Sequence, residues 1–233
     1  SFGFGHKQIL KNVSIDIESN TSMALVGESG SGKTTLVNLI SGLLNVDSGS
    51  VEIDGKNINR LKREDYQSRI GYIAQEAVIF NDTIYNNVTF WAEKTEENIK
   101  RFQKAIDQAL ISTFIDSLQN KEETLLGNNG INLSGGQKQR VSIARELYKD
   151  IDILILDEAT SALDSETERE IQNNIDALKG DYTMVIIAHR LSTIRNVDQI
   201  YLMDDGHITG NGDFNGLINK SEKFKKMVEL QEV

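Results

Sequence analysis

The chain has 233 residues, which is enough for one substantial core or for a core with a subdomain. It contains no cysteine, so disulfides and thiolate metal sites are excluded. Its formal net charge of −10 argues against an extended nucleic-acid surface, which needs a basic stripe. No apolar run approaches the ~20 residues of a membrane span, and no signal peptide is visible. Because the first residue is Ser1, we expect a piece of a longer polypeptide.

Residues 1–26 show several short strand patterns. Phe4 is expected in a strand, and the apolar pair at 9–10 indicates a second. Residues 13–17 alternate between apolar and polar side chains, which is a further strand pattern. The apolar run 23–26 predicts a buried strand. Apolar positions recur at helical spacing from Leu36 to Leu43, so a helix is expected there.

A glycine-rich loop joins this strand to this helix. Its residues match G-x-x-x-x-G-K-[ST], with Gly27, Gly32, Lys33 and Thr34 in the fixed places. The glycines let successive backbone N–H groups point at phosphate oxygens, and the helix N-terminus adds a partial positive charge. Lys33 is expected to reach the β- and γ-phosphates, and the Thr34 hydroxyl to bind Mg²⁺.

The next segments alternate between turns and strands before the pattern becomes helical. Asp54 and Gly55 predict a hairpin turn, and an apolar strand at 70–74 ends at Gln75. Residues 76–150 read as a mostly helical insertion. A helical pattern runs from about residue 95 to 118, with Thr95 as its N-cap.

A second helix of the insertion is predicted from Ser134 to Tyr148. Ser134 and Gln137 form the S-x-x-Q capping box, and Gly135 and Gly136 leave backbone N–H groups open at the helix start. This start is a second site that suits an anion. Two such helix starts but one lysine loop favour a head-to-tail dimer, in which each loop is closed by the other subunit's helix start.

The α/β pattern resumes at residue 151. The apolar strand 151–156 ends in Asp157 and Glu158, at the strand end where ligands bind in open α/β sheets. Asp157 is expected to hold Mg²⁺, and Glu158 to polarise an attacking water as a general base. The remaining predicted elements are a helix carrying Ile171, Ile175 and Leu178, strands at 183–188 and 199–203, a hairpin turn at Asp205-Gly206 and a helical tail at 214–230.

Four motifs together resemble the nucleotide-binding domain of ABC transporters. They are 27–34, the LSGGQ run 133–137, 153–158 and the run Ala-His-Arg-Leu-Ser-Thr at 188–193, and their order and spacing cover nearly the whole chain. The last run resembles exporter-type half-transporters in particular. LSGGQ is the most specific of the four, since many NTPases share the glycine loop.

The resemblance implies a role for several residues. Phe4 stands where the family places an aromatic ring that stacks on adenine. Gln75 corresponds to a glutamine that touches Mg²⁺ or the attacking water, Asp164 to the loop between the two sites, and His189 to a histidine on the γ-phosphate. Lys33, Glu158, Gln75 and His189 would carry catalysis, while Thr34, Gln75 and Asp157 would bind Mg²⁺. The expected nucleotide contacts are Phe4, Gly27, Gly30, Ser31, Gly32, Lys33, Thr34, Thr35, Ser134, Gly135, Gly136, Gln137 and Asp164.

The resemblance also implies an architecture and partners. We expect a P-loop NTPase core, RecA-like, with a mixed sheet flanked by helices and an antiparallel β part, at 1–75 and 151–233, and a helical signature subdomain at 76–150. The cofactors would be ATP and Mg²⁺. The partners would be a second copy of the domain and transmembrane domains fused at the N-terminal side, with no nucleic acid, at the cytoplasmic face of the membrane. Asn128 and Ala77 depart from the family's usual glutamate and proline, which affects coupling and not ATP chemistry.

Two other readings stay open from the sequence. One is a soluble ABC-type ATPase that clamps nucleic acid, against which the acidic charge and the single set of motifs count. The other is a nucleotide sensor that dimerises with ATP but does not turn it over. The transported substrate and the choice between a homodimer and a heterodimer are not encoded in these residues.

Overall fold

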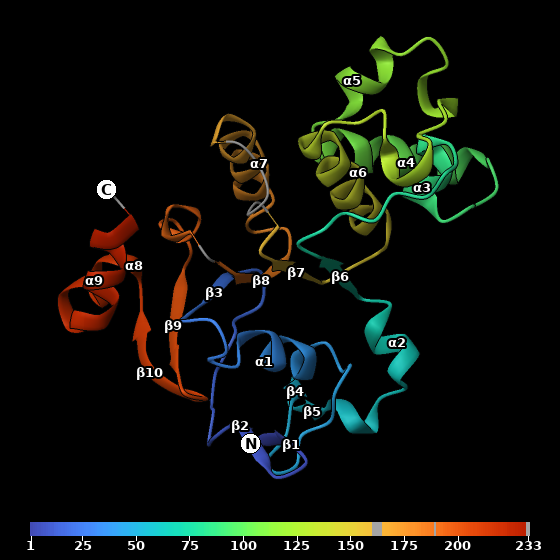
Figure 1. Cartoon of the computed structure of the whole chain (residues 1–233). Coiled ribbons are helices and arrows are strands. Elements are labelled where there is room, and N and C mark those ends of the chain that lie inside the picture. The colour runs from blue at the N-terminus through green and yellow to red at the C-terminus, as the bar shows by residue number, and fades with distance from the viewer. Residues whose placement is uncertain (160–164, 189, 232–233) are drawn as a thin grey trace. The chain divides into compact units, whose positions relative to one another are not determined.

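The computed structural model describes residues 1–159, 165–188 and 190–231 (Figure 1). Its contacts divide the chain into two compact units. Unit 1 comprises Ser1–Ile70, Asp152–Glu158 and Lys179–Val233, and unit 2 comprises Gly71–Ile151 and Ala159–Leu178. The prediction placed residues 159–178 in the core; by contacts they cluster with unit 2.

The sheet of unit 1 is centred on β3 (Ser22–Val26), whose residues are all buried. It pairs in parallel with β8 (Thr183–Ile187) on one side and with β9 (Gln199–Asp204) on the other. Strand β7 (Ile153–Asp157) lies parallel to β8, and β10 (His207–Gly212) returns antiparallel to β9. The sheet is therefore mixed and its parallel part is buried, which confirms the predicted α/β class.

Helices α1 (Lys33–Ile40), α8 (Phe214–Lys220) and α9 (Glu222–Gln231) belong to unit 1. Helices α8 and α9 lie beside β9 and β10 (Figure 1). The predicted helical tail is thus confirmed, but it consists of two helices. The break falls at Ser221, whose hydroxyl oxygen accepts a hydrogen bond from the Phe224 N–H and so begins the second helix.

Helix α1 is shorter than the periodicity predicted. It ends at Ile40, two residues before Gly42, whose φ of 68° is the left-handed conformation that glycine adopts at helix ends. The chain leaves the helix there, so Leu43 is 57% exposed instead of continuing the buried face. The expectation that Leu43 belongs to this helix was wrong.

Two further antiparallel pairs of unit 1 are short hairpins outside the main sheet. Their strands are β1 (Phe2–Phe4), β2 (Lys7–Leu10), β4 (Glu52–Ile53) and β5 (Lys56–Asn57). The turn at Asp54-Gly55 is confirmed, because Ile53 pairs with Lys56. The alternating segment 13–17 is not a strand. Its backbone bonds to a side chain instead: the Tyr201 hydroxyl donates to the Asp16 carbonyl and accepts from the Asp16 N–H.

Strand β6 (Ile70–Ile73) starts at the last residue of unit 1, and the described part of unit 2 after it consists mainly of helices joined by loops. Among the described residues its α-helices are α3 (Ile84–Thr89), α4 (Glu96–Gln108), α5 (Ser112–Ser117), α6 (Gly135–Tyr148) and α7 (Ser165–Ala177). The Thr95 N-cap is confirmed, since its hydroxyl accepts from the Asn98 N–H at 3.2 Å. The single helix expected from 95 to 118 is instead two helices, because Leu110 adopts a positive φ of 51° between them.

Short helices complete unit 1, and α2 (Arg63–Gln67) supplies Tyr66 to the core. The Tyr66 ring packs over Gly42, where an added Cβ would lie 3.3 Å from two ring carbons. Its hydroxyl donates to the carbonyl of Ile40, the last residue of α1. Burial raises the pKa of Tyr66 to about 12.

Replacing Tyr66 by phenylalanine is expected to lower the free energy of unfolding at pH 7 by about 1 kcal/mol, because the buried Ile40 carbonyl loses its donor. The variant should also change the alkaline behaviour. The unfolded tyrosine, with a pKa near 10, ionises before the folded one, so the parent loses stability as pH rises from 10 to 12. The loss is at most about 1.4 kcal/mol per pH unit. Phenylalanine has no such loss.

Urea unfolding of both proteins at pH 7, 10 and 11 measures both effects. Lysine ionisation affects the two proteins alike, so the difference between them isolates Tyr66. The same alkaline slope in parent and variant would contradict the assignment.

Candidate functional site

The glycine loop lies between β3 and α1, as the sequence predicts. A Cβ on Gly27 would lie 2.3 Å from the Met203 carbonyl oxygen, so the loop passes too close to β9 for any side chain. Gly32 caps α1 with a φ of 103°, and a Cβ there would lie 2.7 Å from Leu10 Cδ2. These two positions explain why the loop requires glycine on steric grounds alone.

Lys33 is buried, with 6% of its surface exposed. Its ammonium Nζ donates to the Gly27 carbonyl at 2.8 Å and to the Glu28 carbonyl at 3.0 Å. Burial lowers the pKa of Lys33, and the charges of Glu158 and Asp157 oppose that shift. A buried cation that is held by backbone carbonyls of its own loop is a strong electrostatic attractor for an anion.

Asp157 and Glu158 lie at the carboxyl end of β7, and β8 separates β7 from β3, the strand that precedes the glycine loop. Glu158 has a positive φ of 52°, which is uncommon for a residue other than glycine, and its N–H donates to the Ile187 carbonyl at 3.0 Å. The strand-end turn therefore holds the Glu158 backbone in a fixed, sparsely populated conformation, as occurs at functional sites.

The remaining loop residues differ in exposure. Thr34 is exposed in the first turn of α1, Thr35 is half-buried and Gly30 is exposed. The Ser31 hydroxyl oxygen is buried and has no hydrogen-bond partner among the described residues. An unpartnered buried hydroxyl in the same glycine loop as a buried ammonium fits a phosphate chain.

A divalent cation also fits this donor set. Mg²⁺ is usually bound by one or two protein oxygens together with substrate phosphates, and seldom by a dedicated protein cage. Thr34 and Asp157 offer such oxygens. Among the described residues, no group of three or more acidic, histidine or cysteine side chains could hold a metal ion by itself.

Phe4 ends β1 and is 58% exposed, with its ring edge-to-face against Phe2 at a centroid distance of 4.9 Å. An exposed ring face of this kind can stack on a planar base. Two other predicted residues, Asp164 and His189, lie outside the described part of the chain.

Unit 2 carries the LSGGQ segment at the start of α6. Both bonds of the capping box are present: the Ser134 hydroxyl accepts from the Gln137 N–H at 3.2 Å, and the Gln137 side chain accepts from the Ser134 N–H at 2.9 Å. The two glycines differ. Gly135 is exposed, whereas Gly136 is buried, and a Cβ on it would lie 2.3 Å from the Thr167 methyl group on α7.

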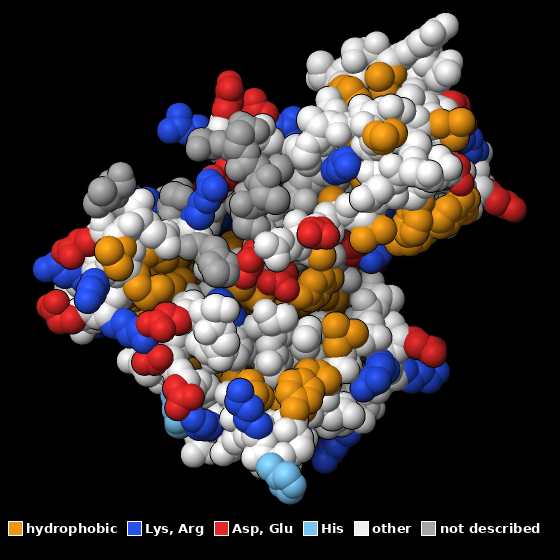
Figure 2. Space-filling model, in the orientation of Figure 1, with side chains coloured by type: hydrophobic (Ala, Val, Ile, Leu, Met, Phe, Trp, Pro, Cys, Tyr) orange, Lys and Arg blue, Asp and Glu red, His pale blue; other side chains and the backbone are white. Residues whose placement is uncertain are grey.

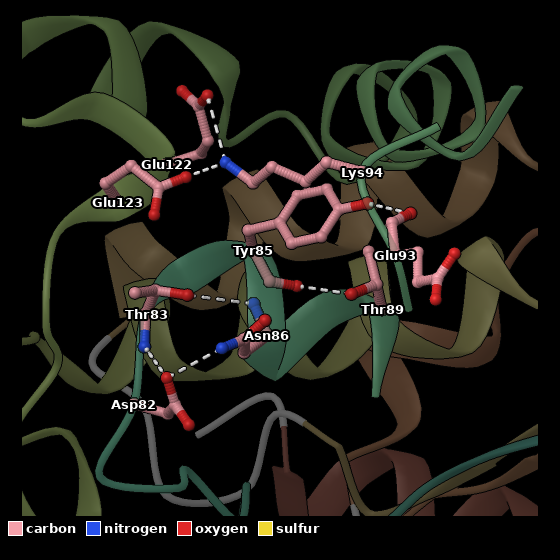
Figure 3. Close-up of polar contacts among 9 residues, drawn as sticks. All are labelled: Asp82, Thr83, Tyr85, Asn86, Thr89, Glu93, Lys94, Glu122 and Glu123. Carbon is pink, nitrogen blue, oxygen red and sulfur yellow. Dashed lines mark hydrogen bonds and ion pairs between the residues drawn. The ribbon is translucent and has the colours of Figure 1, made fainter. Parts of the chain in front are cut away.

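Gln75 is exposed and follows β6 in unit 2. The segment after it is fixed by a polar network (Figure 3). Asp82 accepts from the Thr83 N–H and the Asn86 amide, and its other oxygen accepts from the Trp91 indole N–H at 2.7 Å. These hydrogen bonds, that of Asn86 first, lower the pKa of Asp82.

Arg145 of α6 holds the segment from Val78 to Phe90, and the sequence did not predict this role. Its guanidinium is buried, donates to the Asn87 and Val78 carbonyls at 2.7 Å each, and lies over the rings of Phe80 and Phe90. Asn87 is fully buried and bonds to both backbone groups of Phe80. The only sign of this role in the sequence is that Arg145 lies beside the apolar face of α6, and an arginine at that place is equally common at the surface.

Comparison with known proteins identifies the family. A family model described as ABC transporter matches residues 10–161. The chain belongs to the ABC transporter family. As an ABC ATPase domain it is a nucleotide-binding domain of the P-loop NTPase fold, which confirms the resemblance seen in its motifs.

Several relatives of this ABC domain are named ATP-dependent lipid A-core flippase. The one from Idiomarina loihiensis is 43% identical over 95% of this chain, and the one from Desulfotalea psychrophila is 42% identical over 99%. A solved structure described as a bacterial Atm1-family ABC exporter with ATP bound covers the whole chain at 34% identity with a TM-score of 0.89. The chain spans 38–40% of the length of these proteins. Among the described residues, no helix is both long and apolar enough to cross a membrane.

Substituting Gly136 by alanine should destabilise the protein by about 1–3 kcal/mol, because the new methyl group overlaps the Thr167 methyl group. Adding Thr167→Ser removes that methyl group and should restore most of the loss. Urea unfolding of the parent, both single variants and the double variant measures the coupling. If serine at 167 gives no rescue, the contact is not the reason for glycine at 136.

Proposed function

We propose that this ABC domain binds and hydrolyses ATP and that it is the motor of an exporter or flippase. The observation that carries the proposal is the buried Lys33 ammonium in a glycine loop, with Asp157 and Glu158 close enough to act on its pKa. This arrangement combines an anion-binding loop with carboxylates that can serve Mg²⁺ and water, as phosphoryl transfer requires.

The residues divide by role. Backbone N–H groups of the loop from Gly27 to Thr35, together with Lys33, bind the phosphates, and Phe4 stacks on the adenine ring. Thr34 and Asp157 would hold Mg²⁺, which neutralises phosphate charge when bound. Glu158 accepts the proton of the attacking water, and His189 contacts the terminal phosphate. The fixed turn at Glu158 supports its role, because a general base must hold one position relative to the phosphate.

We propose that two copies of the chain act together, each completing the other's site. Gly135 is exposed at the start of α6, and the capping box satisfies the Ser134 N–H and the Gln137 N–H, which pre-forms a helix start suited to an anion. One chain therefore offers two phosphate-binding elements, in different units. A two-fold dimer joins the glycine loop of one copy to the LSGGQ of the other, and Asp164 would lie in the connection between the sites.

The full transporter would add transmembrane domains N-terminal to this chain and would place the domain at the cytoplasmic face of a membrane. The longer relatives support this arrangement, and their names make a lipid-linked saccharide the first substrate class to test. Figure 2 shows hydrophobic side chains exposed on the part of unit 2 that carries α3. Val78, Phe90 and Trp91 are each about half exposed or more, and Arg145 fixes two of them from behind. We propose this surface as the one that receives the transmembrane domains.

The glutamate variant Glu158→Gln tests hydrolysis. Glutamine keeps the size of the side chain but is no base, so phosphate release should fall by about 100-fold or more while ATP binding persists. Size-exclusion chromatography of the variant with Mg-free ATP should show a species of twice the mass. Glu166→Gln, an exposed position on α7, is the control. Release of phosphate at the parental rate by Glu158→Gln would remove the glutamate from that role.

Serine at position 78 tests the docking surface. Val78→Ser removes an exposed apolar side chain and keeps the carbonyl that Arg145 binds, so the thermal midpoint of the 233-residue chain should change by no more than about 1 °C. In the full-length transporter the same change should lower transport per ATP hydrolysed. Leu43→Ser, at an exposed position of unit 1, is the matched control. Equal coupling in the two variants would place the docking surface elsewhere.

A further inference from the structure

Helix α9 is fixed to unit 1 by its apolar side. Phe224 is fully buried and Val228 nearly so, and the Phe224 ring packs edge-to-face on Phe214 of α8 at a centroid distance of 5.5 Å. Figure 2 shows acidic and basic side chains gathered over the region of these two helices. Because Phe224 and Val228 pack into unit 1, helix α9 has a fixed position, and so do the side chains at its two ends.

Near its N-terminus, Lys223 joins two segments of the nucleotide site. Its ammonium lies 2.8 Å from Asp204 Oδ2 and 3.3 Å from Glu28 Oε1. Asp204 ends β9, and Glu28 is the second residue of the glycine loop. One cation therefore links α9 to the strand end and to the phosphate-binding loop.

The backbone of Glu28 holds the site lysine. Its carbonyl accepts from Lys33 Nζ at 3.0 Å and from the Ser31 N–H at 3.2 Å. The side chain and the carbonyl belong to one residue, so a restraint on the first limits the position of the second. Lys223 thereby acts on Lys33 through Glu28.

At the other end of α9, Gln231 bonds to the segment after β8. Its side-chain oxygen Oε1 accepts from the Leu191 N–H at 2.7 Å. Leu191 is the first residue of a 3₁₀-helix, Leu191–Ile194, and follows His189 by two positions. Lys223 and Gln231 are eight residues apart in one helix, or about 12 Å.

We propose that α9 fixes the position of the glycine loop relative to the segment that follows β8. Lys223 and Gln231 are the positioning residues of this helix. The inference rests on the proposed ATPase function for its purpose, but the ties are between described residues of one unit. Exposed ion pairs contribute little to global stability. Small displacements of a substrate-binding group can nevertheless change activity strongly. Loss of either tie should therefore affect the site more than the fold.

Hydrogen exchange of the nucleotide-free chain tests the ties directly. Lys223→Met should speed exchange of amides at 27–34, and Gln231→Ala should speed exchange at 191–194, with the core strand β8 unchanged. Lys223→Arg and Gln231→Glu, which keep a cation and an oxygen acceptor, should restore protection. Lys226→Met, an exposed lysine on the same helix, is the matched control. Unchanged exchange in the first two variants, or an increase spread over the whole chain, would overturn the inference.

The affinity for ATP tests the consequence. Lys223→Met should weaken ATP binding by about three- to tenfold, and Glu28→Gln should do the same. The double variant should be no weaker than Lys223→Met alone, because that change already breaks the ion pair with Glu28. Additive losses would overturn the tie between these two residues. If the parent itself binds no ATP, the proposed function fails while the exchange experiment still decides the role of α9.

Discussion

The arrangement of unit 1 around the glycine loop depends on the groups that stabilise the buried ammonium of Lys33. Lys33 Nζ has two carbonyl partners from its own loop, and the nearby carboxylates Asp157 and Glu158 partly offset its loss of hydration. Removing a charge from water is costly unless hydrogen bonds and opposite charges replace the lost solvation. The loop must therefore curl tightly around the ammonium, and only glycine at 27 and 32 permits this path beside β9 and β2.

Several distant segments serve this one constraint. Parallel pairing of β3 with β8 and β9 brings the ends of three strands to the glycine loop, and β7 adds its two acids. The turn Asp205-Gly206 returns the chain so that the Gly206 N–H donates to the Ser31 carbonyl at 3.2 Å. Helix α9 adds restraints through Lys223 and Gln231. Residues from distant parts of unit 1 thus hold the glycine loop in place, which suits the preorganised phosphate site that we propose.

The sequence predicted much of the local structure around the candidate residues, because short motifs carry their own geometry. The capping box at Ser134 and Gln137, the N-cap at Thr95 and the turn at Asp54-Gly55 all lie within four residues and are present. Apolar periodicity was less reliable at boundaries. It extended α1 to Leu43 because periodicity does not register a left-handed glycine that stops the helix.

The residues missed are those whose partners are far away in sequence. Arg145 holds the Val78 and Asn87 carbonyls, and Lys223 holds Glu28, yet each looks like an ordinary charged residue of a solvated helix. The strand predicted at 13–17 was also wrong, because the backbone of Asp16 bonds to the Tyr201 hydroxyl and not to a neighbouring strand. Patterns of hydrophobicity report burial, and they do not report which polar group supplies a hydrogen bond.

The most direct measurement of the central claim is calorimetric titration of the parent chain and of Lys33→Met with Mg-free ATP at fixed salt. Methionine keeps the length and apolar stem of the side chain and removes the buried ammonium. We predict saturable binding of one ATP per chain by the parent and a loss of at least about tenfold in affinity for the variant. Equal affinities in two folded proteins would contradict the assignment of Lys33 and its loop as the phosphate site.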